Sequence, residues 1–245
     1  MDLSLVIPVF NEQDNVQPLL DEIRAALDGL DYEVLFIDDG SSDATAQRLA
    51  GLQADEPRLR VLRHPANLGQ SAALLSGILA ARAPWIATLD GDGQNDPADI
   101  PALYAAAQAD AQLWLVCGWR RQRHDSWLKR LSSRIANAVR GTLLGDATPD
   151  TGCGLKLLRR DAALQLPRFD HMHRFLPALV LRAGGGVRSL PVNHRPRRCG
   201  VSKYGLFNRL WIGIVDLFGV LWLRRRALNP QAREAGAAGQ RPGAS

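Results

Sequence analysis

Three oxygen-bearing side chains follow one another at alternate positions directly after an apolar run. Asp90, Asp92 and Gln94 stand behind the apolar stretch 85–89, with one glycine between each pair. An extended chain projects alternate residues to one side, so these side chains can aim at a single point. Two carboxylates that close need a cation between them, or one must keep its proton. Because Mg²⁺ and Mn²⁺ take oxygen ligands and bridge carboxylates to substrate phosphates, the spacing predicts a metal–diphosphate site, with a solvated Asp/Gly turn as the alternative.

Apolar runs that alternate with helical patterns must position this cluster. The strands expected are 3–9, 33–38, 59–63, 85–89 and 113–117, and the helices expected between them are 14–28, 43–54, 69–82 and 98–109. Nearly continuous apolar runs are typical of strands covered on both faces. The alternation predicts an α/β domain with a mostly parallel sheet and helices on both faces.

Two further polar turns stand at the ends of expected strands. PVFNE occupies 8–12 and DDGSS occupies 38–42. Ligands of parallel sheets bind beyond the carboxyl ends of the strands, so we expect both turns to meet the 90–94 cluster at one edge. One of Asp38 and Asp39 can cap the next helix, but both cannot be mere caps. No glycine-rich dinucleotide motif and no P-loop motif follows the first strand.

Charge is divided unevenly along the chain. Residues 1–56 hold 13 acidic and 2 basic side chains, a net charge of −11, and the whole chain carries +5, so residues 57–245 carry +16. Basic side chains gather in segments 118–140 and 195–203. Such clusters suit a phosphorylated substrate or an anionic membrane surface. No nucleic acid partner is expected, because the sequence has no RNA- or DNA-binding signature and its aromatic residues are not interleaved with the basic ones.

The cysteines and the first residues indicate a reducing compartment. The three cysteines are widely spaced and form no CxxC pair, which argues against a disulfide framework or a structural zinc site. The first 13 residues have no basic region and too short an apolar stretch for a signal peptide.

Eight ordered motifs resemble a known family. PVFNE, IDDGSSD at 37–43, NLGQSAALLSG at 67–77 and LDGDGQNDP at 89–97 look like family 2 glycosyltransferases of the GT-A fold. GWR at 118–120, WLKRLSSRIAN at 127–137, DTGCGLKLLRR at 150–160 and HRPRRCGVSKYG at 194–205 resemble the dolichyl-phosphate mannose synthase group, whose bacterial members glycosylate polyprenyl phosphates. The resemblance covers residues 3–205 and implies a GT-A catalytic domain over 1–203.

The resemblance also implies roles for individual residues. A nucleotide site is implied at Pro8, Phe10, Asn11, Glu12, Asp38, Asp39 and Gly69, and a site for Mg²⁺ or Mn²⁺ at Asp90, Asp92 and Gln94. The acceptor phosphate is implied to meet Arg120, Lys129, Arg130, Ser133, Arg197, Ser202 and Lys203. Lys stands at 129 where family members often have Arg, and Arg130 is the alternative. The residues expected to carry catalysis are Asp92, Arg120, Lys129, Ser133, Arg197 and Asp150.

The implied activity is an inverting, metal-dependent sugar transfer. A GDP- or UDP-linked sugar would pass to an undecaprenyl- or dolichyl-type phosphate at the cytoplasmic face of the cytoplasmic membrane, to which the protein is expected to bind peripherally. A lipid phosphate is already anionic at neutral pH, whereas a hydroxyl acceptor needs a base. Asp150 is therefore a candidate base or, as we prefer, a positioning residue. The alternatives are a family 2 transferase acting on a hydroxyl of a polysaccharide or lipid A, and a catalytically silent nucleotide-sugar-binding scaffold.

The chain changes character after Lys203. Between 210 and 223 only Asp216 is charged, an apolar run of 14 residues, which is shorter than the ~20 residues that span a bilayer. Leucines at helical spacing, Trp211, Trp222 and a basic end predict an amphipathic helix over 204–226 that lies on the membrane. Homo-oligomerisation or packing against the catalytic domain is the alternative. The Ala/Gly/Pro-rich tail 227–245 is expected to be disordered.

The histidines are assigned from their surroundings in the sequence. His171 and His173 have no Cys or His partner nearby that would complete a metal site, so a helix start or a donor-sugar contact is preferred. His194 is a candidate phosphate contact, and His64 is expected to be an ordinary loop residue.

Overall fold

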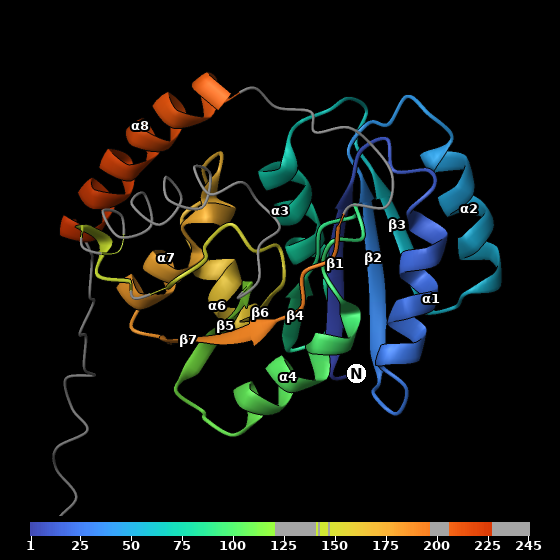
Figure 1. The fold of residues 1–245 in the computed structure, drawn as a ribbon, viewed down its shortest axis with the longest axis horizontal. Helices are drawn as coiled ribbons and strands as arrows, with labels where there is room; N and C mark the ends of the chain where they lie inside the picture. The colour runs from blue at the N-terminus through green and yellow to red at the C-terminus, as the bar shows by residue number, and fades with distance from the viewer. Residues whose placement is uncertain (121–140, 142, 147, 197–205, 227–245) are drawn as a thin grey trace, which may run out of the picture.

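The computed structural model describes residues 1–120, 141, 143–146, 148–196 and 206–226. Their strands form a seven-stranded sheet in the order β3-β2-β1-β4-β6-β5-β7 (Figure 1). The strands are β1 (Leu3–Val9), β2 (Tyr32–Asp38), β3 (Leu59–Arg63), β4 (Trp85–Thr88), β5 (Leu113–Arg120), β6 (Lys156–Arg159) and β7 (Gly186–Val192). The α-helices are α1 (Val16–Ala26), α2 (Thr45–Asp55), α3 (Gln70–Ala80), α4 (Ile100–Gln108), α6 (Arg160–Gln165), α7 (Leu176–Arg182) and α8 (Leu206–Arg225), with 3₁₀ turns η1 (Pro97–Asp99) and η2 (Met172–Arg174).

The sheet is mostly parallel, as the alternation of elements predicts. β1 pairs in parallel with β2 and β4, β2 with β3, and β5 with β7. β6 is the exception, because it runs antiparallel to both β4 and β5. The five strands expected from the sequence are all present with small shifts of their ends. β6 and the edge strand β7 were not anticipated.

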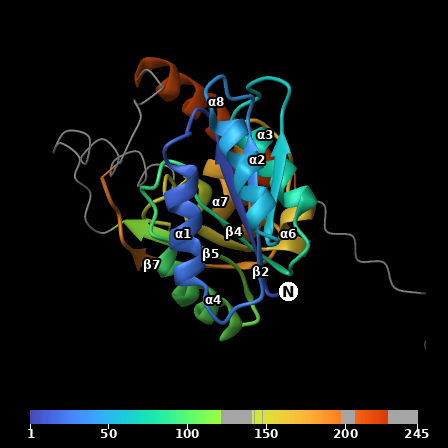
Figure 2. The same ribbon diagram turned by 90° about the vertical axis from the view of Figure 1, so that its right-hand side faces the viewer.

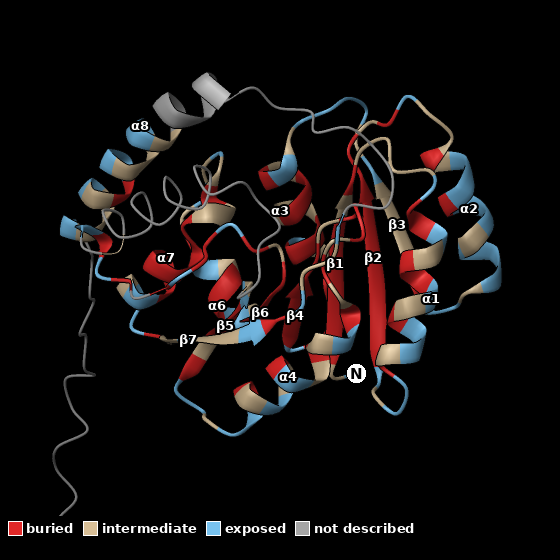
Figure 3. Ribbon diagram, in the orientation of Figure 1, coloured by how far each residue is buried: buried red, intermediate tan, exposed pale blue. Residues whose placement is uncertain are grey.

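Two hydrophobic cores cover the two faces of the sheet (Figures 2 and 3). Along β1, Leu3, Leu5 and Ile7 belong to the core that α1 and α4 cover, whereas Val6 belongs to the core that α3, α6 and α7 cover. Successive strand residues point to opposite faces, so a strand buried on both sides must be apolar at nearly every position. This arrangement explains the continuous apolar runs of the first half.

One edge of the sheet gathers the polar turns. The carboxyl ends of the parallel strands meet there, as expected for this topology. Because β6 runs the opposite way, its first residue comes to the same edge, where Lys156 pairs with Thr88 of β4 and with Cys117 of β5. A residue of the second half of the chain thus lies beside the 90–94 turn.

The last described helix, α8, packs on the domain through one side. Val220 is buried, and Leu217 and Leu221 pack against the core beside α7. On the other side lies the exposed stripe, which we define as Val215, Phe218 and Trp222 (54%, 66% and 61% exposed). Among the helices that the structure describes, none combines the length and the hydropathy that a membrane crossing requires. The expected tail 227–245 lies outside the described residues.

Candidate functional site

A cavity of about 570 Å³ opens at the polar edge of the sheet. The residues expected to bind ligands that line it are Pro8, Phe10, Glu12, Asp39, Asp90, Asp92, Gln94 and Arg120. Asn11, Asp38 and Gly69 are absent from its lining. The acceptor-phosphate residues Lys129, Arg130, Ser133, Arg197, Ser202 and Lys203 lie outside the described residues. The three polar turns therefore converge, as the strand order predicts.

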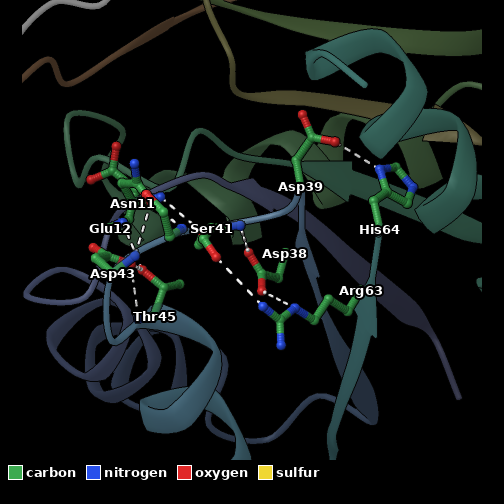
Figure 4. A network of polar contacts seen from close by, with 10 residues as sticks. Asn11, Glu12, Asp38, Asp39, Ser41, Asp43, Thr45, Arg63 and His64 are labelled. Atoms are coloured by element: carbon green, nitrogen blue, oxygen red, sulfur yellow. Dashed lines mark hydrogen bonds and ion pairs between the residues drawn. The ribbon is translucent and has the colours of Figure 1, made fainter. Parts of the chain in front are cut away.

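Asp39 is the carboxylate that the β2 end contributes to the cavity. Its Oδ1 accepts the Leu68 amide at 2.9 Å, and its Oδ2 accepts the Gly69 amide at 2.8 Å. Nδ1 of His64 lies 2.7 Å from Oδ1 (Figure 4), and Nε2 of the same ring lies 2.9 Å from Oγ of Ser76. The expectation that His64 is an ordinary loop residue is wrong, because the ring holds Asp39 in place. Gly69 acts through its backbone, which has a φ of 91°.

Asn11 and Asp38 shape the turns behind Asp39 rather than the cavity (Figure 4). Oδ1 of Asn11 accepts the backbone amide of Ser42 at 2.8 Å, while the backbone amide of Asn11 donates to Oγ of Ser41 at 2.9 Å. Asp38 is fully buried, accepts the Ser41 amide at 2.9 Å and pairs with Arg63 at 3.2 Å. Of the two neighbouring aspartates, Asp38 therefore holds the turn and Asp39 faces the cavity.

Hydrogen bonds and close packing hold the carboxylates of the 90–94 turn. Oδ1 of Asp90 accepts from Nε2 of Gln70 at 2.9 Å, and Oδ1 of Asp92 accepts the Gln94 amide at 3.1 Å. The other side of Asp90 lies against Gly154, where an added Cβ would come within 2.2 Å of Oδ2. Only glycine therefore leaves room for this carboxylate.

The electrostatics of the turn fit a divalent cation. Burial raises the pKa of Asp90, the charge of Asp92 raises it further, and the charges of Lys156 and Arg120 oppose both effects. A metal ion between the carboxylates would relieve this repulsion. In the described part of the chain, no group of three or more His, Cys, Asp or Glu converges on one point. Mg²⁺ commonly takes one or two carboxylates and completes its shell with water and substrate phosphates, so Asp90, Asp92 and Gln94 fit Mg²⁺ or Mn²⁺.

Arg120 and Asp150 form a buried two-point ion pair. Nε of Arg120 donates to Oδ2 of Asp150 at 2.7 Å, and Nη2 donates to Oδ1 at 2.9 Å. Burial alone would lower the pKa of Arg120, but Asp150 outweighs it and raises the pKa. Arg120 lines the cavity and Asp150 does not. Asp150 thus holds the guanidinium of Arg120 from outside the cavity lining.

The β6 side of the cavity holds Lys156, which sequence reasoning left without a role, and His173, for which it preferred a helix start or a donor-sugar contact. Lys156 is only 4% exposed, and its ammonium donates to the Cys153 carbonyl. His173 lies 2.7 Å through Nδ1 from Oγ of Ser71. Burial, with the charges of Lys156 and Arg174, lowers the pKa of His173 to about 3, so its ring is neutral. The signal that could have found Lys156 is a single lysine after a glycine-rich turn in an otherwise apolar run, at 152–158.

The chain that leaves β7 is hydrogen-bonded to the 90–94 turn and to Asn95. The Arg195 amide donates to the Gln94 carbonyl at 3.1 Å, and Asn95 forms an isolated β-bridge with His194. Nη2 of Arg195 donates to Oε2 of Glu22 at 2.7 Å and to the Asn95 carbonyl at 2.8 Å. The start of the basic cluster 195–203 therefore lies against the turn that bears the carboxylates.

Comparison with protein families and with curated proteins gives consistent matches. The model of "Glycosyl transferase family 2" matches residues 4–166. Dodecaprenyl-phosphate galacturonate synthase of Rhizobium johnstonii is 38% identical over 238 residues, which cover 94% of this chain and 69% of that protein. Undecaprenyl-phosphate 4-deoxy-4-formamido-L-arabinose transferase of Edwardsiella ictaluri is 36% identical over 207 residues, which cover 83% of this chain and 63% of that protein. The chain thus spans about two thirds of the length of these relatives.

Solved structures confirm the fold class. Glucosyl-3-phosphoglycerate synthase from Mycobacterium tuberculosis, in complex with Mn²⁺, uridine diphosphate and phosphoglyceric acid, matches with a TM-score of 0.69 at 20% identity over 93% of this chain and 80% of that chain. Its complex with Mg²⁺ and uridine diphosphate matches with a TM-score of 0.68 at 21% identity over 91% and 79%. At this identity the likeness supports the α/β fold and carries no residue roles.

Proposed function

Because the chain belongs to glycosyltransferase family 2, we propose that it transfers one sugar from a nucleotide diphosphate donor to a polyprenyl phosphate. The observation that carries the proposal is the order of groups along one sheet edge. Asp39 lies at the end of β2, Asp90 and Asp92 follow β4, and the cations Lys156 and Arg120 lie at β6 and β5. A nucleoside, its diphosphate with a metal, and the reacting sugar and acceptor phosphate would occupy these places in that order.

The transfer is a single displacement at the anomeric carbon. An acceptor phosphate oxygen forms the new bond, and the bond from the anomeric carbon to the donor diphosphate breaks, its electron pair leaving with the nucleoside diphosphate. Mg²⁺ or Mn²⁺, when bound by Asp90, Asp92 and Gln94, would neutralise the charge that develops on this leaving group. Attack from the opposite face inverts the configuration. No proton moves, because the acceptor phosphate is already ionised.

The geometry of Asp150 favours a phosphate acceptor over a hydroxyl acceptor. A hydroxyl needs a base within hydrogen-bond reach, and Asp150 was the candidate. Both of its oxygens instead accept from Arg120, and it lies outside the cavity lining. Arg120 itself faces the cavity, where its positive charge suits a phosphate.

The proposal places the enzyme at a membrane surface. The exposed stripe of α8 offers apolar side chains at helical spacing, and Arg224 and Arg225 close the helix. Such a helix suits the interface of an anionic membrane, where its lipid substrate resides. We propose peripheral binding at the cytoplasmic face, where nucleotide sugars are made, and we keep a second copy of the chain as the alternative partner of this stripe.

The test is transfer by the purified full chain. The protein is incubated with Mn²⁺, a panel of UDP- and GDP-sugars and radiolabelled undecaprenyl phosphate, and lipid extracts are examined for a glycolipid. Asp92→Asn should abolish the product, whereas Asp96→Asn should keep it, because Asp96 caps η1 from the same turn through the Ala98 amide. A labelled polysaccharide or lipid A product in place of the glycolipid would overturn the proposal, as would transfer that persists in Asp92→Asn.

A further inference from the structure

Lys156 is a buried cation that lines the cavity beyond the 90–94 turn. It begins β6, lies opposite Thr88 of β4, and is 4% exposed while still lining the cavity. The charge of Lys156 acts on both Asp90 and His173, so its ammonium lies near the 90–94 turn and near η2. Along the sheet edge this is the side of the 90–94 turn away from Asp39, since β6 and β2 lie on opposite sides of β4.

Among the described residues, little negative charge balances the positive charge of this ammonium. Its hydrogen bond goes to the Cys153 carbonyl, which is neutral. Within the described part of the chain no carboxylate forms an ion pair with it, and Asp90 acts on it only at longer range. A metal ion on the 90–94 turn would take up the charge of Asp90. The neighbouring cation Arg120, by contrast, is balanced by Asp150.

The other groups at this end of the cavity add no negative charge. His173 lines it with a ring that is neutral, and Arg174 lines it as a second cation. Leu74 of α3 and Leu176 of α7 also line the cavity and carry no charge. A buried cation without an anionic partner is costly, so an anion of the substrate is the natural counterpart of Lys156.

We propose that the transferred sugar is a uronic acid and that Lys156 binds its carboxylate. The inference rests on the proposed function, since it assigns the sugar of that donor. A neutral sugar of the same ring would place a hydroxymethyl group against the ammonium and leave the charge unbalanced. A site built for a charged group discriminates strongly against an analogue that lacks it. Lys156 is thus a specificity-determining residue.

The test compares donor binding in the absence of lipid. Affinities of the full chain with Mn²⁺ are measured by calorimetry for UDP-galacturonate against UDP-galactose, UDP-glucuronate against UDP-glucose, and GDP-mannuronate against GDP-mannose. The uronate of at least one pair should bind about tenfold or more tightly than its neutral partner, the range expected for a charge-assisted hydrogen bond in a buried site. Lys156→Met should remove that preference and leave the affinity for the free nucleoside diphosphate unchanged.

Controls separate the proposed role from a structural one. Arg159→Met removes a cation from the same strand, where it pairs with Asp161 outside the cavity, and should keep the uronate preference. Lys156→Arg should retain part of it. Unchanged affinity of Lys156→Met for the free nucleoside diphosphate shows that the site is folded, and the wild-type comparison of donors needs no variant.

Three outcomes would overturn the inference. The wild-type protein could bind neutral donors as tightly as uronates in all pairs. Lys156→Met could weaken both members of a pair equally. The substitution could leave donor binding intact and weaken only undecaprenyl phosphate, which would make Lys156 an acceptor contact. A uronate preference without transfer to undecaprenyl phosphate would instead sustain the assignment of the sugar and refute the proposed function.

Discussion

The position of the Asp90 carboxylate depends on Gly154, which has no side chain. An added Cβ at Gly154 would lie 2.2 Å from Oδ2 and 2.4 Å from Cγ of the Asp90 carboxylate. We therefore expect Gly154→Ala to push the carboxylate aside and to weaken Mn²⁺ binding at least tenfold, a loss of about 1.4 kcal/mol or more. Mn²⁺ titration followed by electron paramagnetic resonance measures this directly.

The matched control for that variant is Gly51→Ala. Gly51 lies in α2, where an added Cβ meets nothing within 4 Å. The substitution should leave Mn²⁺ binding unchanged and stabilise the helix by about 1 kcal/mol. Equal Mn²⁺ affinity of Gly154→Ala and wild type would show that Asp90 does not hold the metal from this position.

The role of Asp150 is decided by a substitution that keeps its shape. Asp150→Asn retains one acceptor for Arg120 but loses the charge of the ion pair. If Asp150 positions Arg120, glycolipid formation should fall by about ten- to a hundredfold, mainly through a raised KM for the lipid phosphate. Steady-state kinetics with undecaprenyl phosphate measure this. A fall of about 10⁴-fold in kcat with KM unchanged would instead mark it as a base.

At the scale of residues, the sequence predicted well which motifs form the site. It predicted poorly which residues of one motif face the cavity and which hold the turn. Asp90 and Asp92 line one cavity as the sequence predicted, but β4 ends at Thr88 and a turn carries them, in place of the extended chain from which their alternation was interpreted. The sequence could not tell Asp38 from Asp39, since the difference lies in the fold of the 64–69 loop, which delivers two amides and the ring of His64 to Asp39 alone. Lys156 escaped notice because a lysine close to Arg159 and Arg160 looks like an exposed surface residue.

At the scale of elements, Glu33 ties three strands and a loop together. This buried residue of β2 accepts from Ser4 of β1 at 2.7 Å, from Arg60 of β3 at 2.7 Å, and from the Arg82 amide at 2.8 Å. Burial alone would raise the pKa of Glu33, but these hydrogen bonds outweigh it and lower the pKa below its ordinary value. Glu33 therefore contributes stability that is fully present above its unfolded pKa and is lost as the pH falls through its folded pKa.

The prediction concerns the pH profile of unfolding. Glu33→Gln should lower the free energy of unfolding at neutral pH by roughly 1–3 kcal/mol, and the difference from wild type should shrink as the pH falls below about 4.5. Urea denaturation at a series of pH values measures both. Asp55→Asn removes an exposed carboxylate at the end of α2 and should leave the profile unchanged. A difference from wild type that stays constant with pH would contradict the assignment of the charge.

The elements themselves were largely predictable in the first half of the chain and less so in the second. β1 to β5 were found because both faces of the sheet are covered, which demands apolar runs. β6 has four residues with a basic residue at each end, and β7 lies at an edge with Pro191 inside it. Such short or edge strands carry little apolar periodicity. Their pairing depends on the neighbouring strands, which a local pattern does not report.

At the scale of the whole molecule, the exposed stripe of α8 places three large apolar side chains, each more than half exposed, on one helix. Val215, Phe218 and Trp222 recur at three- and four-residue spacing and so share one face. Phe218→Asp with Trp222→Asp should reduce binding to phosphatidylglycerol vesicles at least tenfold, because each aromatic side chain contributes about 1.5–3 kcal/mol when it leaves water. Vesicle sedimentation measures the loss.

The control places the same charge on an exposed apolar residue elsewhere. Leu79→Asp changes an exposed leucine of α3 and should keep vesicle binding. Both proteins should bind nucleoside diphosphate like wild type, since none of the α8 residues that the structure describes lines the cavity. If the double variant keeps its vesicle affinity but changes from dimer to monomer in analytical ultracentrifugation, the stripe is a contact between two copies.

The antiparallel course of β6 has a consequence for which changes of length the chain can accept. The segment from Asp150 to Lys156 runs along the cavity. It supplies Asp150, which pairs with Arg120, Gly154, against which the Asp90 carboxylate packs, and Lys156, which lines the cavity. These three contacts are spaced along seven consecutive residues and run into a strand whose register is set on both sides. One inserted or deleted residue here would turn Lys156 to the other face of the sheet or shift Gly154 off the carboxylate. The segment should therefore tolerate substitutions at some positions and no change in the number of residues.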